Sequence, residues 1–215
     1  RAGLRATALH MSKPTDIRVI GAALYFLPVR TRVPLKFGAE TLTEVMCARV
    51  RVRVTNRRGQ TSEGWGETPL SVQWVWPSAL GYEPRHAALK SFCELLAKEW
   101  AGFDGCGHAL EIGHDFQEHV LPRLLKDFNQ TRGGEAMPWL AALVCCSLFD
   151  LAVHDAYGQL LGRPVFETYT GEFISRDLAS FLTPAEGAGA SFASKFPAEF
   201  LNHNRPTALR AWHLV

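Results

Sequence analysis

Side chains that could bind a metal ion gather between residues 108 and 119 of the sequence. The set consists of His108, Glu111, His114, Asp115, Glu118 and His119. Successive histidines in it are six and five residues apart, whereas two histidine ligands on one helical face are separated by four. The spacing therefore favours a solvated loop and helix start over a metal site.

Two carboxylates that could act as a catalytic pair occur further along the chain. Asp150 and Asp155 lie five residues apart in a long apolar segment. We interpret them as buried hydrogen-bond and capping partners rather than paired catalytic groups. Nucleophilic hydrolase chemistry has no support, because Ser71, Ser78 and Ser147 lie outside any G-x-S-x-G pattern.

The composition is that of a globular protein, with 47% hydrophobic and 20% charged residues. A net charge of +2 gives no electrostatic case for a nucleic-acid partner. No segment approaches the roughly 18 consecutive apolar residues of a membrane span. The five cysteines form no C-x-x-C pair and predict reduced thiols in a cytosolic protein. They are Cys47, Cys93, Cys106, Cys145 and Cys146.

The first part of the chain predicts an antiparallel sheet. Residues 16–27 are β-rich, and a polar, basic loop follows over residues 28–38. In the strand predicted over residues 42–55, alternating valines and arginines place the valines on a buried face and the arginines on a solvent face. Residues 61–68 return as its hairpin partner. A nucleic-acid role for the arginine row is disfavoured, because no basic helix or aromatic stacking platform accompanies it.

Helical periodicity dominates the second part. It predicts helices over about residues 87–100, 114–128 and 138–161. The last is apolar nearly all round, which is typical of a helix buried on several sides. Beyond it we expect a short strand at residues 177–182, a helix around residues 190–201 and a strand at residues 209–215.

Three motifs in order resemble a known family. The opening strand leads into a loop with Pro34, Phe37 and Gly38, and the hairpin RVRVTNRRGQTSEGWGET carries Gly64, Gly66 and Glu67 as a G-x-G-E motif. The third is SLFDLAVHDAYGQLLGRPVFE, residues 147–167. Over about residues 16–182 the chain resembles the mandelate racemase/muconate lactonizing enzyme branch of the enolase superfamily. It departs at residues 168–172, where TYTGE replaces the family's usual Leu-Leu-Gly-Gly.

The resemblance implies an α+β capping domain, an antiparallel sheet plus helices, followed by the beginning of an incomplete TIM-type (β/α) barrel. We expect a flexible lead over residues 1–11 with Met11 as the natural start, the cap over residues 12–137 and the start of the truncated barrel over residues 138–215. A complete barrel needs about 250 residues. The chain is therefore expected to be a fragment or a truncated product, with poor solubility by itself.

In function, the resemblance implies a Mg²⁺-dependent isomerase or lyase: a racemase, cycloisomerase or acid-sugar dehydratase. Such an enzyme removes the proton α to a substrate carboxylate, and the metal stabilises the developing charge. The family's Lys-x-Lys base motif is missing and its metal-binding acids come later in the sequence. We therefore assign no catalytic residue and no metal ligand here, and expect the chain alone to be inactive.

The substrate-binding candidates lie in two loops that in this family close over the barrel mouth. Arg30, Arg32, Lys36 and Phe37 lie in residues 28–38, and Trp74 and Trp76 lie in residues 68–77. The cationic side chains would suit an anionic or hydroxylated acid, whereas the tryptophans could equally be packing anchors.

The expected partners of the parent are a small carboxylate or acid-sugar substrate and further copies of itself, in the cytoplasm, with no nucleic acid or membrane. The alternative is a non-catalytic, cap-like binding or interaction module. For Glu67 of the G-x-G-E motif a structural role is favoured, although in the family this position lies near where the cap meets substrate.

Overall fold

The computed structural model describes residues 13–37, 40–202, 206–208 and 210–211. The lead predicted over residues 1–11, the proposed start at Met11 and most of the strand predicted over residues 209–215 lie outside this part of the chain.

A four-stranded antiparallel sheet forms one layer, in the order β3-β2-β1-β4. Its strands are β1 (Ile17–Phe37), β2 (Glu40–Asn56), β3 (Thr61–Pro69) and β4 (Cys106–Gly107). The loop predicted over residues 28–38 is wrong, because β1 continues through residue 37. On the side of β1 that faces β4, the two strands pair only at Ile17 and Arg18. The rest of this edge of β1 tolerates proline, because no backbone N–H is needed there for a hydrogen bond to a neighbouring strand. A register shift between Arg30 and Leu35 accommodates Pro34.

The two faces of β2 divide as the sequence predicts. Val50, Val52 and Val54 are fully buried, whereas the arginines between them point to solvent. There they pair with glutamates of β3. The predicted α+β arrangement is confirmed, with a sheet buried on one side and exposed on the other.

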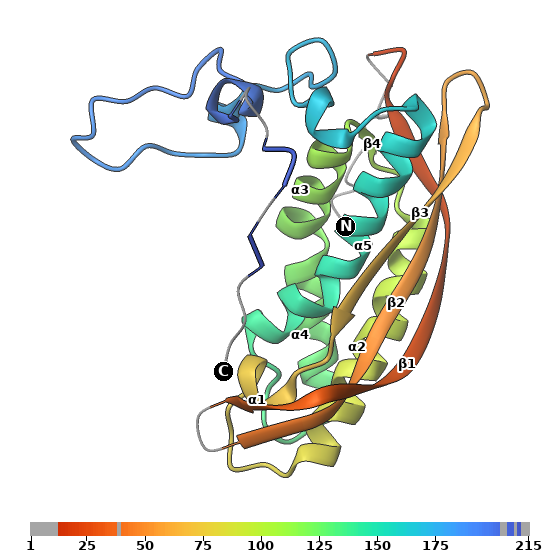
Figure 1. Ribbon diagram of the computed structural model, residues 1–215, viewed down its shortest axis with the longest axis vertical. Helices are drawn as coiled ribbons and strands as arrows, with labels where there is room; N and C mark the ends of the chain where they lie inside the picture. The colour runs from red at the N-terminus through yellow and green to blue at the C-terminus, as the bar shows by residue number, and fades with distance from the viewer. Residues whose placement is uncertain (1–12, 38–39, 203–205, 209, 212–215) are drawn as a thin grey trace, which may run out of the picture.

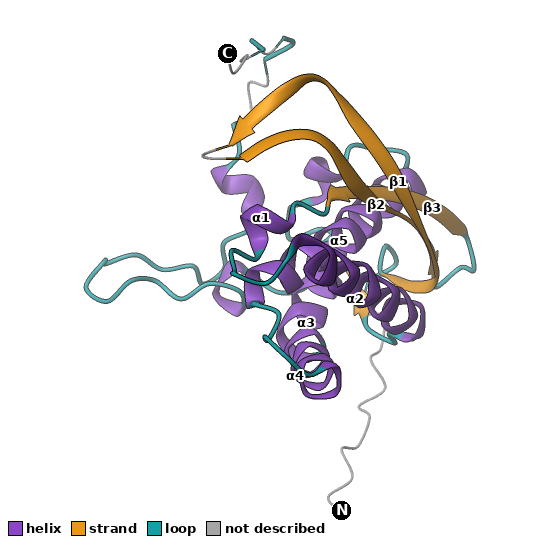
Figure 2. Ribbon diagram, turned by 90° about the horizontal axis from the view of Figure 1, so that it is seen from below, coloured by secondary structure: helices purple, strands orange, loops and turns teal. Residues whose placement is uncertain are grey.

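Among the described residues, five α-helices lie on the inner side of the sheet (Figure 2). They are α1 (Val72–Val75), α2 (Tyr82–Gly102), α3 (Ala109–His119), α4 (Leu121–Arg132) and α5 (Trp139–Leu161). Of these, α2 and α5 pack directly against the sheet. The single helix predicted over residues 114–128 is two helices, because the chain turns at Val120 and Pro122 occupies the first turn of α4. The helix predicted over residues 138–161 is confirmed as α5.

Helix α5 is the centre of the molecule, packed between the sheet and helices α3 and α4 (Figure 1). Its 23 residues are long and apolar enough, by length and composition alone, to cross a membrane. Within the protein, 56% of its most apolar 18-residue stretch is buried, and a core helix meets the same criteria. Polar residues such as Asp150 and Asp155 interrupt the apolar run, which is why counting consecutive apolar residues predicts no span.

The chain after α5 forms only short 3-10 helices, at Val165–Thr168, Leu178–Ser180 and Pro197–Phe200. The strand predicted at residues 177–182 is wrong, and the helix predicted around residues 190–201 is reduced to one short turn. The backbone N–H of Leu178 donates to the Lys195 carbonyl, but this isolated hydrogen bond does not pair residues 177–182 with another strand. Among the described residues, no barrel strand follows α5. The hydrophobic core runs without interruption from the sheet through Met137 into α5.

Candidate functional site

The close contact between β3 and α5, which we call the seam, depends on two glycines. A Cβ atom at Gly64 would lie 2.1 Å from the backbone N of Ala156, and one at Gly66 would lie 1.9 Å from the carbonyl O of Leu148. Both distances are far below the 3.0 Å that real Cβ atoms keep. The obstacles are backbone atoms, so no rotamer change relieves the clash. The strand reaches the helix at this distance only with glycine.

Asp155 of α5 completes the seam by accepting a hydrogen bond, 2.8 Å long, from the backbone N–H of Trp65. β3 is an edge strand, and this carboxylate satisfies a donor that faces away from β2. The predicted role of Asp155 as a hydrogen-bond partner is confirmed, but its side chain is half-buried and not buried as predicted. The motif Gly64-Trp65-Gly66 and the helix that contains Asp155 are therefore joined directly.

Asp150, one and a half turns before Asp155, lies where α5 crosses α3. A Cβ atom at Gly113 of α3 would lie 2.0 Å from Asp150 Oδ1, so a larger residue there would displace the Asp150 carboxylate. Burial raises the pKa of the Asp150 carboxyl, and the nearby His154 imidazole opposes that shift. Among the described residues, this pair is not part of a group of three His, Cys, Asp or Glu side chains that could hold a metal ion.

The start of α3 holds a buried polar network that the sequence pattern did not predict. His108, expected in a solvated loop, is 0% exposed. Its Nδ1 accepts the N–H of Leu110 at 3.0 Å, so Nε2 carries the proton and donates it to Thr168 Oγ1 at 2.8 Å. Burial lowers the pKa of His108 to about 3, and the positive charges of His154 and Lys13 add to the effect.

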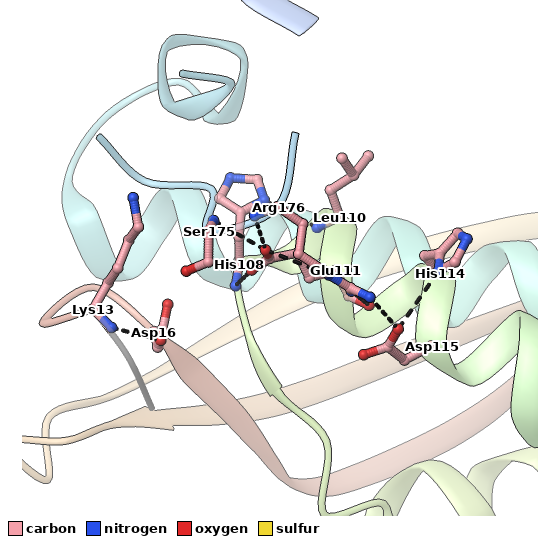
Figure 3. Close-up of polar contacts among 9 residues, drawn as sticks. All are labelled: Lys13, Asp16, His108, Leu110, Glu111, His114, Asp115, Ser175 and Arg176. Atoms are coloured by element: carbon pink, nitrogen blue, oxygen red, sulfur yellow. Dashed lines mark hydrogen bonds and ion pairs between the residues drawn. The ribbon is translucent and has the colours of Figure 1, made fainter. Parts of the chain in front are cut away.

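Glu111 is the second buried member of this network (Figure 3). One carboxylate oxygen accepts the backbone N–H of His108 at 2.9 Å, and the other accepts those of Ser175 and Arg176 at 3.0 and 2.9 Å. The guanidinium of Arg176 donates to Asp115 Oδ1 at 2.8 Å and to the Glu111 carbonyl at 3.0 Å. Together these bonds fasten residues 168–176 to α3.

The solvated-loop prediction is thus wrong for His108 and Glu111, although it holds for Glu118 and His119, which are exposed. A signal was present in the sequence. In a helix capping box, an acidic residue follows three positions after a residue whose side chain can accept a hydrogen bond. His108 and Glu111 form such a box.

The network has little capacity for ligand chemistry. Both ring nitrogens of His108 and both carboxylate oxygens of Glu111 already have protein partners. Among the described residues, no three His, Cys, Asp or Glu side chains come together to hold a metal ion. These residues do not fit a Mg²⁺ site, and we derive no step through the metal.

The predicted substrate-binding cations lie on a projecting hairpin formed by residues 28–37 of β1 and 40–46 of β2, which we call the hairpin arm (Figure 1). Arg30, Arg32 and Lys36 are exposed. Arg30 has a distant ionic partner, since its Nε is 3.9 Å from Glu44 Oε2. Phe37 belongs to β1, but its side chain lies outside the described part of the chain.

The two predicted tryptophans differ greatly in solvent exposure. Trp74 on α1 is 51% exposed, whereas Trp76 is 1% exposed. The indole N–H of Trp76 donates to Glu135 Oε1 at 2.7 Å, the Ser78 hydroxyl donates to the other oxygen, and the Arg132 guanidinium covers the ring at 5.0 Å. Trp76 thereby fixes the loop that carries Trp74 to the connection between α4 and α5.

The hairpin arm and α1 lie at the same end of the molecule, as both views show (Figures 1 and 2). Among the described residues, no hydrogen bond or ion pair links Trp74 to the arm's three cations. Of the predicted site, Arg30, Arg32, Lys36 and Trp74 are therefore separate exposed side chains, and Trp76 is part of the core.

No protein-family model and no curated protein matches the sequence. Solved structures do match it. The L-Ala-D/L-Glu epimerase from Bacillus subtilis matches with a TM-score of 0.40 and 17% identity, over 72% of this chain and 34% of that chain. For a mandelate racemase/muconate lactonizing protein from Herpetosiphon aurantiacus the values are 0.40, 16%, 74% and 36%.

For L-talarate/galactarate dehydratase from Salmonella typhimurium LT2 they are 0.40, 16%, 78% and 35%. The chain spans about a third of the length of these structures. A TM-score of 0.40 is too low to support an argument about function. The function proposed for the chain therefore rests on its own residues.

Proposed function

We propose that the chain is the N-terminal portion of a Mg²⁺-dependent enzyme of the mandelate racemase/muconate lactonizing type, which removes the proton α to a substrate carboxylate. In this proposal the chain supplies the lid and the substrate-selecting loops. The metal ligands and the bases belong to parts of the protein outside this chain.

One observation carries the proposal: the seam. The hairpin motif and the helix motif that resemble the family are far apart in sequence, and Trp65 and Asp155 are separated by 90 positions. Two sequence motifs that resembled the family only by chance would not be expected to contact each other in the fold. Here the motif glycines are the residues that allow contact with α5, and the helix motif supplies the acceptor for Trp65 N–H. The two motifs are halves of one packing unit.

The hairpin arm supports the lid role. Its exposed Arg30, Arg32 and Lys36 side chains stand at one end of the molecule, beyond the part of the sheet that α5 covers. A projecting cationic hairpin could bind the distal carboxylate or hydroxyl groups of a substrate and exclude water as it closes. These residues would bind and orient the substrate. Trp74 would add an apolar contact from α1, and the buried Trp76 would hold α1 in position.

Helix α5 also presents a surface suited to the rest of a barrel. Leu140 and Leu151 are exposed on a helix whose other sides are buried, and Trp139 and Phe166 are exposed nearby in sequence. Such apolar surface on a protein marks an interaction site. We propose that it packs against the remainder of the barrel domain, of which residues 138–215 would be the beginning and residues 12–137 the cap.

The continuous core favours a second candidate, a cap-like binding module without catalysis. The sheet, α2 and α5 bury their apolar faces against one another without help from another domain. Such a module would fold cooperatively by itself and bind its ligand without turnover.

Proton exchange in D₂O tests the proposal. The protein that contains this chain is incubated with a panel of amino-acid dipeptides, 2-hydroxy acids and acid sugars, with Mg²⁺ or with EDTA, and deuterium at the α carbon is followed by NMR. We expect Mg²⁺-dependent exchange for at least one class and none with the isolated chain. Exchange catalysed by the isolated chain would contradict the proposed division of labour. Absence of exchange across the panel would favour the binding module.

A further inference from the structure

The outer face of the sheet carries an exposed aromatic pair that the lid role does not use. Tyr25 of β1 and Trp65 of β3 are 42% and 48% exposed, and their rings stack across β2 with centroids 6.0 Å apart. An open depression of about 400 Å³ lies beside the pair, lined by Arg49, Trp65, Gly66 and Glu67. Large exposed aromatics next to arginine are typical of the centre of a protein interface.

The charges around this pair follow the register of β2 and β3. Arg49 lies opposite Glu67, Arg51 opposite Trp65, and Arg53 opposite Glu63. These six residues, which we call the outer ladder, form two rows that run along the strands. One row is entirely cationic, and the other is acidic with a tryptophan at its centre.

This pattern is complementary to itself. A two-fold axis parallel to the strands, placed between β2 and β3 and above the face, lays the β2 row of one copy over the β3 row of another. Positions along the strands are preserved by that rotation. Arg49 then meets the second copy's Glu67, Arg53 meets its Glu63, and Arg51 meets its Trp65 in a cation–π contact.

We propose that the outer ladder is the interface for a second copy of this chain, in an isologous, face-to-face dimer of sheets. Aligned sheets pack about 10 Å apart, which leaves room for arginine and tryptophan side chains between them. The depression beside Trp65 gives space for a side chain of the second copy. Sheet twist limits the contact to the central rungs of the ladder. The inference is independent of the lid function.

Sedimentation velocity of the chain over a concentration series tests the dimer. We expect reversible dimerisation that weakens as salt is raised, because the ladder's ion pairs are solvent-exposed. Trp65→Ala should weaken association at least about tenfold, as loss of a central aromatic does. Trp74→Ala is the matched control, since that tryptophan is equally exposed at a distant position, and it should leave association unchanged.

A charge reversal gives a second, independent variant in case Trp65→Ala disturbs folding. Arg51→Glu places an acid opposite the second copy's Trp65 and should abolish the dimer. Arg58→Glu, the same change on the exposed β2–β3 turn, should not. Circular dichroism checks that each variant is folded. A chain that stays monomeric at about 100 µM, roughly 100-fold above a Kd of about 1 µM, would overturn the proposal. So would a dimer that survives both ladder variants but is lost in Leu151→Gln, which would assign association to α5.

Discussion

The seam and the hairpin arm show two different uses of sequence in one sheet. In the seam, Gly64 and Gly66 bring a strand so close to α5 that a single added carbon meets backbone. In the arm, the same sheet extends beyond the helices, and Arg30, Arg32 and Lys36 have ample space. The seam thus permits few substitutions, whereas the arm permits many. The motifs that most resemble a family are in the seam, so what they specify is packing, while the residues proposed to select a substrate lie where packing imposes least.

Adding one carbon to the seam should have the largest effect. Gly66→Ala places a Cβ atom 1.9 Å from the Leu148 carbonyl O, so β3 and α5 must separate and the core beneath them opens. We expect a loss of more than about 3 kcal/mol in the free energy of unfolding, measured by urea denaturation.

Gly21→Ala is the matched control for this change. Gly21 also lies in a strand, but nothing stands within 4 Å of its Cβ position, so its stability should change by less than about 0.5 kcal/mol. Equal losses for Gly66→Ala and Gly21→Ala would mean that the seam is not the tight contact described.

The pH dependence of stability should report the buried His108, which supports residues 168–176 after α5. Its pKa is about 3 in the folded protein against 6.5 when unfolded. Below about pH 6.5 the unfolded state therefore binds more protons, so stability is complete above that pH and falls as pH drops toward 3. At pH 5 the loss relative to pH 8 is about 2 kcal/mol.

His108→Asn removes the titration while keeping an acceptor for the Leu110 N–H, since asparagine is a good N-cap. The variant should lose about 2 kcal/mol less than the wild type between pH 8 and pH 5, measured by urea denaturation at both values. Asp150, whose raised pKa acts in the opposite direction, contributes equally to both proteins. Parallel pH profiles would show that His108 is protonated without unfolding.

A substitution that affects the segment between β3 and α2 should have a smaller effect on stability. In this segment Trp76 is buried and held in place, whereas Trp74 is exposed. Glu135→Ala leaves the buried indole N–H of Trp76 without its acceptor and should cost about 1–2 kcal/mol. Glu135→Gln retains an acceptor oxygen and should recover most of the loss. The stability of both variants is measured by urea denaturation followed by tryptophan fluorescence. Stabilities identical to that of the wild type would show that Glu135 does not hold α1 in place.

The arm should show the smallest change in stability. Arg30→Ala, Arg32→Ala and Lys36→Ala together remove exposed charges, of which, within the described part of the chain, Arg30 alone has an ionic partner, at 3.9 Å. Exposed pairs of this kind contribute about 0–1 kcal/mol, so thermal unfolding should be nearly unchanged. A loss as large as that of Gly66→Ala would show that the arm is part of the core.

What could be predicted from the sequence was the local periodicity. The alternation of Val50, Val52 and Val54 with arginines gave the correct faces of β2, and the apolar run with Pro138 and Gly162 at its ends gave α5. Both signals are repeated many times within one element, so tertiary contacts do not change their meaning.

The remainder depends on contacts between distant residues. Pro28 and Pro34 suggest a loop unless it is known that β1 has a free edge. His108 and Glu111 read as solvated until residues 168–176 are placed against them. Gly64 and Gly66 form a recognisable motif in the sequence, but the contact that requires glycine is with α5, more than 80 residues later. The sequence predicts a loop for Arg30, Arg32 and Lys36, whereas in the structure they belong to strand β1.

The most direct test of the central claim compares specificity with chemistry in the protein that contains this chain. Values of kcat and kcat/KM are measured for two matched substrates, one with an anionic and one with a neutral distal group, in wild type and in the triple arm variant, with Arg58→Ala as a charge control. The account predicts that the preference for the anionic substrate falls about tenfold, the effect of losing a charge-assisted contact, while kcat for the neutral substrate is unchanged. An equal fall in kcat for both substrates would place the arm in the chemical step and contradict the account.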